Sequence, residues 1–283
     1  MATESQQRSP GELDVRALAR ESIHLDDLDT QLVTLSQLDS ALALGIRGAI
    51  LREIPPGAQG PSAAERMRLE GALTGIRKAL THDEISNLVV DEIVTRPGAA
   101  YLGEVAVFLR SKSAGRLRAG FTYLRSPGGQ KAFSDFLAGL ATHPPEPLHL
   151  QRVQQLLTGG REVELALVFS HDAVRAAMAA VAPQLPTILR REMPEWEQRN
   201  ATERDTFRDS LQRTLTLQTY YVLYALSDDD VDAVLRFWRS APGKWWSSTR
   251  IEVSTAVMRA RLSAAASLLA PSHGDAPPLA PAH

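Results

Sequence analysis

The chain has 283 residues, of which 44% are hydrophobic, so it can bury the core of one large or two medium domains. Its formal net charge of -2 argues against a generally basic nucleic-acid-binding protein, and we expect no nucleic acid partner. The sequence contains no cysteine, which excludes disulfides, thiolate metal sites and cysteine nucleophiles.

The N-terminal residues 1–12 are poor in large apolar side chains, so we predict that they are disordered. Residues 1–10 also lack the apolar core of a secretory signal peptide. The protein is therefore expected in the periplasm if a leader preceded residue 1, and in the cytoplasm otherwise. We expect no transmembrane segment, because no stretch approaches the roughly 20 apolar residues that cross a bilayer.

Apolar residues recur at helical spacing along nearly the whole chain. Within residues 203–226, for example, Phe207, Leu211 and Leu215 recur every fourth residue. No convincing run of alternating β-branched residues appears. We therefore predict an all-α fold, a helical bundle.

Proline-glycine corners interrupt this helical pattern in residues 95–98, 125–129 and 239–243. Proline lacks the N–H that continues a helix, and glycine accepts the left-handed conformation that ends one. Each corner is followed by aromatic residues, namely Tyr101, then Phe133 and Phe136, then Trp245 and Trp246. The chain is thus predicted to consist of helix pairs joined at kinks.

A proline cluster at residues 144–147 nearly halves the chain and is the predicted domain boundary. Residues 80–85 (LTHDEI) and 226–231 (LSDDDV) share an apolar residue, a hydroxyl N-cap and mostly acidic residues, the pattern of a capping box. We therefore interpret residues 13–142 and 148–270 as two diverged copies of one helical unit.

The first copy contains an additional kinked hairpin, residues 111–140. The C-terminal residues 271–283 are rich in proline and poor in large apolar groups, so this tail is predicted to be disordered.

Residues 226–246 resemble a small all-helical bacterial family catalogued as domain of unknown function twenty fifty-nine. Its members show a short acidic N-cap, an apolar helix, a phenylalanine-aromatic pair, a serine and a proline-glycine kink. These features match Ser227, Asp228 to Asp230, Phe237 with Trp238, Ser240, and Pro242 with Gly243. Residues 121–133 match the same kink through their S-P-x-G-Q-K portion. The resemblance implies a protein exported to the bacterial envelope, without an established activity.

A basic hairpin is the first candidate binding site. Residues 105–134 contain no acidic residue, and they include phenylalanines and a tyrosine. Clustered cations beside aromatic rings could bind phosphate, nucleic acid or an anionic lipid surface. The favoured alternative is a solvated helix face that pairs with acids elsewhere, such as Asp26, Asp27 and Asp29. The cations are Arg110, Lys112, Arg116, Arg118, Arg125 and Lys131.

Tryptophans surround the last corner and form the second candidate site. Trp238, Trp245 and Trp246 could line an aromatic ligand pocket or anchor the protein at a membrane interface. The favoured interpretation is that they pack in the angle between two helices.

Motifs for catalysis or metal binding are weak. The acids and histidine of residues 82–84 lack metal-ligand spacing, and we predict neither a metal nor a cofactor. Ser170 is interpreted as the N-cap of a new helix. The sequence favours a protein without enzymatic activity; the alternative is an enzyme with Glu195, Glu197 and Asp205 around Trp196.

The resulting functional prediction is a non-enzymatic interaction module of the bacterial cell envelope. It would bind a protein partner or a second copy of itself. The alternative is a helical carrier that holds an apolar or anionic small molecule between the two bundles. The carrier requires a cavity of more than about 300 Å³ near the basic hairpin and the tryptophans, whereas a dense core there would exclude it.

Overall fold

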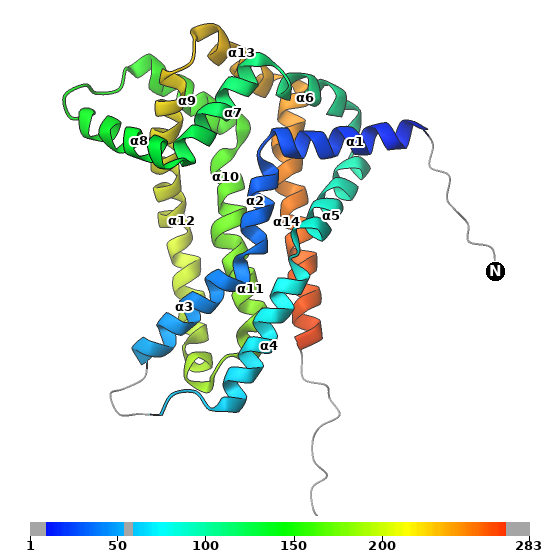
Figure 1. The fold of residues 1–283 in the computed structure, drawn as a ribbon, viewed down its shortest axis with the longest axis vertical. Helices are drawn as coiled ribbons and strands as arrows, with labels where there is room; N and C mark the ends of the chain where they lie inside the picture. Colours follow the sequence, from blue (N-terminus) through cyan, green and yellow to red (C-terminus); the bar gives the residue numbers. More distant parts are fainter. Residues whose placement is uncertain (1–9, 54–58, 270–283) are drawn as a thin grey trace, which may run out of the picture.

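The computed structural model describes residues 10–53 and 59–269, and within these ranges the chain is helical with short connections (Figure 1). The predicted all-α class is confirmed. The helices are α1 (Pro10–Leu25), α2 (Leu28–Ser36), α3 (Leu38–Glu53), α4 (Ala63–Ala79), α5 (His82–Thr95), the 3₁₀ turn η1 (Ala99–Tyr101), α6 (Leu102–Leu109), α7 (Lys112–Arg125), α8 (Pro127–Gly139), α9 (Pro147–Gly160), α10 (Glu162–Leu167), the π-helical turn η2 (Val168–Asp172), α11 (Ala173–Val181), the 3₁₀ turn η3 (Ala182–Gln184), α12 (Thr187–Tyr224), α13 (Asp228–Arg239) and α14 (Ala241–Leu269).

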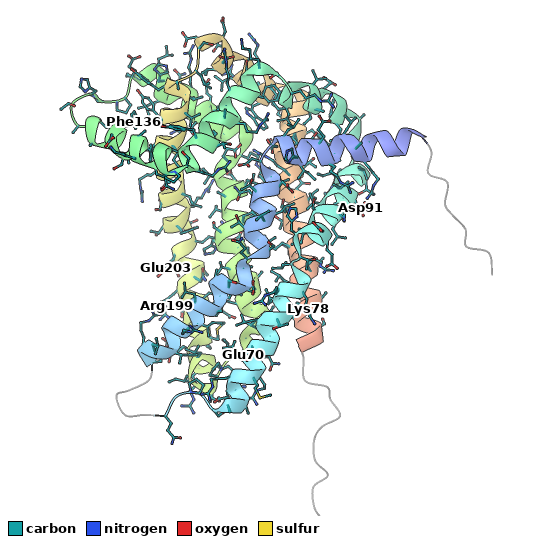
Figure 2. All side chains as sticks on the ribbon, viewed as in Figure 1. Glu70, Lys78, Asp91, Phe136, Arg199 and Glu203 are labelled. Carbon is teal, nitrogen blue, oxygen red and sulfur yellow. The ribbon has the colours of Figure 1, made fainter. Side chains whose placement is uncertain are left out.

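Long helices run along the main axis of the molecule. In Figure 1, α12, α10 with α11, and α14 stand upright, while α6, α7, α8 and α13 gather at one end. Figure 2 shows side chains on all of these helices, both between the ribbons and on the outside of the molecule. The tail predicted to be disordered lies outside the described residues, and so does most of segment 1–12, although α1 begins at Pro10.

One hydrophobic core joins the two halves of the chain. It contains Val89 and Ile93 of α5 together with Val253 and Val257 of α14, each at most 4% exposed. Across the predicted boundary, α14 packs on α4 and α5, and α12 packs on α7. The description of the chain as two copies of one unit stays a prediction.

The corner between α7 and α8 depends on Ser126 and Gly129. The Ser126 hydroxyl accepts a hydrogen bond from the Gly129 N–H (3.1 Å) and donates one to the Tyr123 carbonyl oxygen (2.7 Å). A Cβ at Gly129 would overlap with that carbonyl oxygen. Glycine is therefore required here because two helix ends approach closely, and the prediction that it ends a helix in the left-handed conformation is wrong.

The corner between α13 and α14 has the same construction. Ser240 accepts from the Gly243 N–H (3.2 Å) and donates to the Phe237 carbonyl oxygen (2.6 Å), which a Cβ at Gly243 would overlap. The corner after α5 differs, because Gly98 has a φ of 92° and is left-handed as predicted. Two of the three corners thus share one geometry.

The capping predictions have mixed outcomes. Before α13, the Ser227 hydroxyl accepts from the Asp230 N–H (3.3 Å), which confirms Ser227 as the N-cap, but the Asp230 carboxylate accepts from that hydroxyl (2.7 Å) and not from the Ser227 N–H that a capping box requires. Thr81 is the N-cap of α5, but its side chain makes no capping hydrogen bond. A complete capping box that the sequence analysis missed joins Ser62 and Glu65 before α4.

Ser170 is not a helix N-cap. It lies in the π-helical turn η2, inside a continuous run from α10 to α11, and its hydroxyl donates to the Ala166 carbonyl oxygen (2.6 Å). A π-turn inserts one extra residue, so the apolar positions after it are offset from those before it. The sequence of one continuous helix therefore has the apolar pattern of two separate helices.

This same run, Glu162–Gln184, is long and apolar enough to cross a membrane by length and composition alone. In the structure, 44% of its most apolar window is buried inside the protein, and a core helix meets the same criteria. The absence of a transmembrane segment therefore stays a prediction.

Candidate functional site

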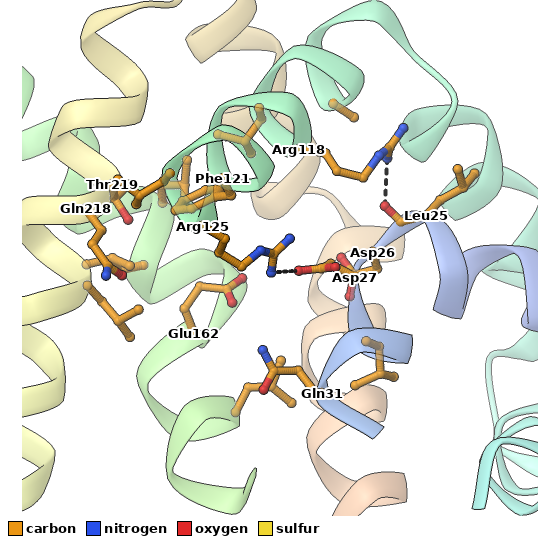
Figure 3. Close-up of a pocket in the computed structure, with 18 of the residues that line it drawn as sticks. Leu25, Asp26, Asp27, Gln31, Arg118, Phe121, Arg125, Glu162, Gln218 and Thr219 are labelled. Carbon is orange, nitrogen blue, oxygen red and sulfur yellow. Dashed lines mark hydrogen bonds and ion pairs between the residues drawn. The ribbon is translucent and has the colours of Figure 1, made fainter. Parts of the chain in front are cut away.

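A pocket of about 540 Å³ lies between the two halves of the chain (Figure 3). Its walls come from the end of α1, from α2, α6 to α10 and α12 to α14, and from the link between α1 and α2. Most of its lining is apolar. The apolar lining residues are Leu25, Leu28, Phe108, Leu109, Ala114, Leu117, Phe121, Leu124, Phe133, Leu156, Leu157, Leu165, Leu215 and Trp238.

Polar groups are fewer and occupy defined places on the wall. Amide and hydroxyl side chains are contributed by Gln31, Gln130, Gln218 and Thr219. The charged lining residues are Asp26, Asp27, Arg118, Arg125, Glu162 and Arg250. An apolar cavity with a few placed polar groups is the usual form of a small-molecule site.

Arg250 of α14 is the centre of a buried ionic cluster. Its side chain is 3% exposed, and its guanidinium donates to Asp26 (2.9 Å) and Glu162 (2.6 Å). It also donates to the carbonyl oxygen of Gly160 at the end of α9 and lies 5.1 Å from the centre of the Trp238 ring. One cation therefore joins four different segments of the chain beside the pocket.

Burial determines the protonation of this cluster. It raises the pKa of Asp26 to about 6, and the Glu162 charge adds to the increase, while Arg250 opposes it. Burial by itself would lower the pKa of Arg250, but Asp26 and Glu162 outweigh it, so this pKa is raised and the guanidinium stays charged. The Arg250 Nε is buried without a hydrogen-bond partner in the described structure, whereas the Trp246 indole lies close enough to Asp26 to oppose the rise of its pKa. The cluster is thus only partly satisfied.

Two arginines of the basic hairpin lie at the pocket and are already engaged (Figure 3). Arg125 forms an ion pair with Asp27. Arg118 donates to the carbonyl oxygens of Leu25 (2.7 Å) and Leu109 (3.4 Å), the last residues of α1 and α6. A cation there offsets the negative ends of two helices.

The other hairpin cations do not line this pocket. Arg110 pairs with Glu21, Arg116 with Asp230, and Lys131 with Asp135. Lys112 is exposed and makes no ion pair with a side chain that the structure describes. The favoured interpretation, pairing with acids elsewhere, is correct for Arg110, Arg116 and Arg125, although of the three acids named as examples only Asp27 takes part.

Of the three tryptophans in the second candidate site, one lines the pocket and two do not. Trp238 is 6% exposed and lines the pocket, and Trp246 is fully buried in the core. The Trp245 indole donates to the Pro97 carbonyl oxygen (2.8 Å), and its ring lies 2.7 Å from where a Cβ at Gly98 would be. Trp245 and Trp246 therefore pack between helices, and Trp238 alone of these three belongs to the pocket.

A second pocket of about 380 Å³ lies between α3, α11 and α12, where Figure 2 labels Arg199. Trp196 contributes to its wall. The acids proposed for an enzyme, Glu195, Glu197 and Asp205, are exposed and do not line it. In residues 10–53 and 59–269 no group of His, Asp and Glu side chains is arranged to hold a metal ion.

Sequence reasoning missed Arg250 and Glu162 as site residues and named Asp26 only as a partner for the basic hairpin. The sequence of α14 does contain a feature that could have identified Arg250. Arg250 follows Trp246 by four residues and precedes Val257 by seven, so it lies within the apolar stripe of the helix. A charged residue in such a stripe is rarely buried without a partner.

No family model matches the chain, and no characterised protein and no solved structure matches it significantly. The resemblance of residues 226–246 to an envelope family therefore stays a prediction.

Proposed function

We propose that the protein is a non-enzymatic helical carrier, and that the pocket between its two halves binds a small molecule with an apolar body. The single observation that carries this proposal is the cavity itself. Its volume of about 540 Å³ lies within the range of roughly 300–1,000 Å³ that is typical of ligand sites. Aromatic and leucine side chains line it and provide the apolar contact area.

The charged groups at the pocket make an anionic ligand the less favoured form of this carrier. Arg125 is paired with Asp27, and Arg118 donates to two main-chain carbonyl oxygens. An anion would have to displace Asp27 from Arg125 before it gained an ion pair of its own. We therefore assign most of the affinity to the apolar body of the ligand.

Isothermal titration calorimetry of the full chain with naphthylethanol, a neutral apolar probe, tests this function. The expected result is saturable binding to one site. Leu117→Trp, which adds volume inside the pocket, should weaken binding at least about tenfold, whereas Leu137→Trp on the exposed side of α8 should leave it unchanged. Thermal melting of both variants verifies folding. Absence of saturable binding to the wild-type chain would contradict the carrier function.

An interaction module of the cell envelope is the second candidate. Leu44 and Leu51, seven residues apart on α3, are 73% and 72% exposed, and Met67 of α4 is 72% exposed. Exposed apolar side chains of this size support contact with a partner or a second copy. Sedimentation velocity of the full chain, with Leu44→Glu as the variant, tests self-association. A monomer at every concentration would contradict a homodimer.

A further inference from the structure

The ion pairs at the pocket contain more carboxylates than cations. Asp26 and Glu162 share the guanidinium of Arg250, and Asp27 has Arg125. These pairs therefore comprise three carboxylates and two guanidiniums. The remaining guanidinium at the pocket, that of Arg118, donates to carbonyl oxygens at two helix C-termini and joins no carboxylate in the described structure.

We infer that the pocket selects a ligand that carries a protonated amine or a quaternary ammonium group on its apolar body. This inference deepens the proposed carrier function and rests on it. Glu162 is the carboxylate that a ligand cation would approach, because its side chain is 29% exposed and lines the cavity. The Asp26 side chain is only 7% exposed and is bound to Arg250.

The aromatic part of the wall suits the same ligand. Phe108, Phe121 and Phe133 line the cavity that holds these carboxylates. Aromatic faces attract organic cations, and the attraction strengthens where water is excluded. The protein already uses this contact once, since the Arg250 guanidinium lies over the Trp238 ring. Aromatic side chains are a recurrent means by which proteins recognise quaternary ammonium ligands.

Desolvation supplies the thermodynamic reason. A buried carboxylate costs free energy unless a cation compensates it, and two carboxylates with one guanidinium are compensated incompletely. Burial is the main cause of the raised pKa of Asp26, and the nearby Glu162 charge adds to it. An ammonium group near Glu162 would balance the second carboxylate of the Arg250 cluster, whereas a carboxylate ligand would add a third negative charge beside that guanidinium.

Three isosteric probes test the inference on the full chain at a pH of about 8: naphthylethylammonium, naphthylethanol and naphthylacetate. The ammonium probe should bind at least about tenfold more tightly than the alcohol, and the acetate most weakly. Glu162→Gln keeps a hydrogen-bond acceptor for Arg250 and should remove most of the ammonium preference, with the alcohol affinity unchanged. Glu164→Gln, on the same helix but outside the pocket, should retain the preference.

Each result decides between the two proposals. If the alcohol binds and the ammonium probe is no tighter, the inference is overturned and the carrier function survives. Tightest binding of the acetate also overturns the inference, in favour of an anionic ligand. If no probe binds, the carrier function fails. The ranking on the wild-type chain decides the matter even when Glu162→Gln does not fold, and an unchanged preference in a folded Glu162→Gln variant excludes Glu162 as the partner.

Discussion

Asp27 and Arg161 are the two non-glycine residues of the described chain with a positive φ, and each adjoins a carboxylate that binds Arg250. Asp27 has a φ of 63° between α1 and α2, and Arg161 has a φ of 53° between α9 and α10. A residue with a Cβ that adopts this left-handed backbone conformation loses about 1–2 kcal/mol of stability to steric strain. The chain therefore makes two strained corners where it positions Asp26 and Glu162, and such strain is typical of binding sites.

Relief of this strain gives the first prediction. Arg161→Gly should raise the free energy of unfolding by about 1 kcal/mol, because glycine adopts a positive φ without a steric cost. Urea denaturation measures the change. Arg161→Ala is the control, since it removes the same side chain, including the bond to Ser248 (3.3 Å), but keeps a Cβ. Equal stability of the glycine and alanine variants would show that the backbone at this corner is not strained.

The second prediction concerns the pH dependence of stability. Asp26 has a pKa of about 6 in the folded protein against an ordinary value of 3.8. Between these values the folded state binds more protons than the unfolded state, so the contribution of Asp26 to the free energy of unfolding falls as pH rises from 4 to 6. Asp26→Asn removes this titration. The stability of the wild type relative to this variant should therefore fall by on the order of 2 kcal/mol over that window.

Asp230 provides the control, because its titration has the opposite sign. Hydrogen bonds from Ser227, Ser113 and Arg116 lower its pKa to about 2. The contribution of Asp230 to the free energy of unfolding is complete above pH 4 and is lost as pH falls toward 2. Denaturation of Asp230→Asn against wild type should thus change with pH only in that lower range. A difference for Asp26→Asn that stays flat from pH 4 to 6 would contradict the assigned burial effect.

The predictable part of the structure is local in the sequence. Leu211 and Leu215 recur at helical spacing, and Ser227 accepts the N-cap hydrogen bond from Asp230 that their spacing indicates. These features depend on residues within one or two turns of each other. Ser170 shows the limit of such reasoning, because a π-turn alters the phase that periodicity measures.

The site was not predictable in this way because its parts are far apart in the sequence. Asp26, Glu162 and Arg250 lie on different segments, and only tertiary packing brings the two carboxylates to one guanidinium. The basic hairpin was the stronger sequence signal, yet Arg110 and Arg116 pair with acids away from the pocket. Cation density along the sequence therefore pointed to Arg118 and Arg125 at the pocket but not to the buried cluster around Arg250.

The shared construction of two corners gives the third prediction. Gly129→Ala and Gly243→Ala should each destabilise the protein by about 3 kcal/mol or more, because the added methyl group overlaps with a carbonyl oxygen of the preceding helix. Gly128→Ala is the matched control. A Cβ at Gly128 would have no neighbour within 4 Å, so this variant should be neutral or more stable by up to about 1 kcal/mol. Similar effects at Gly128 and Gly129 would contradict this geometry.

The fourth prediction concerns the contact between α7 and α12 at Gly120 and Val222. A Cβ at Gly120 would lie 2.6 Å from the Val222 Cγ1, and Val222 is 2% exposed. Gly120→Ala should therefore force the two helices apart and cost about 1–3 kcal/mol. Val222→Ala should cost about 1–2.5 kcal/mol through loss of buried methyl groups. The double variant replaces one methyl group with another across the contact, so it should be more stable than the sum of the single changes by at least about 1 kcal/mol. Urea denaturation of all four proteins completes the cycle, and additive losses would mean that the two residues do not touch.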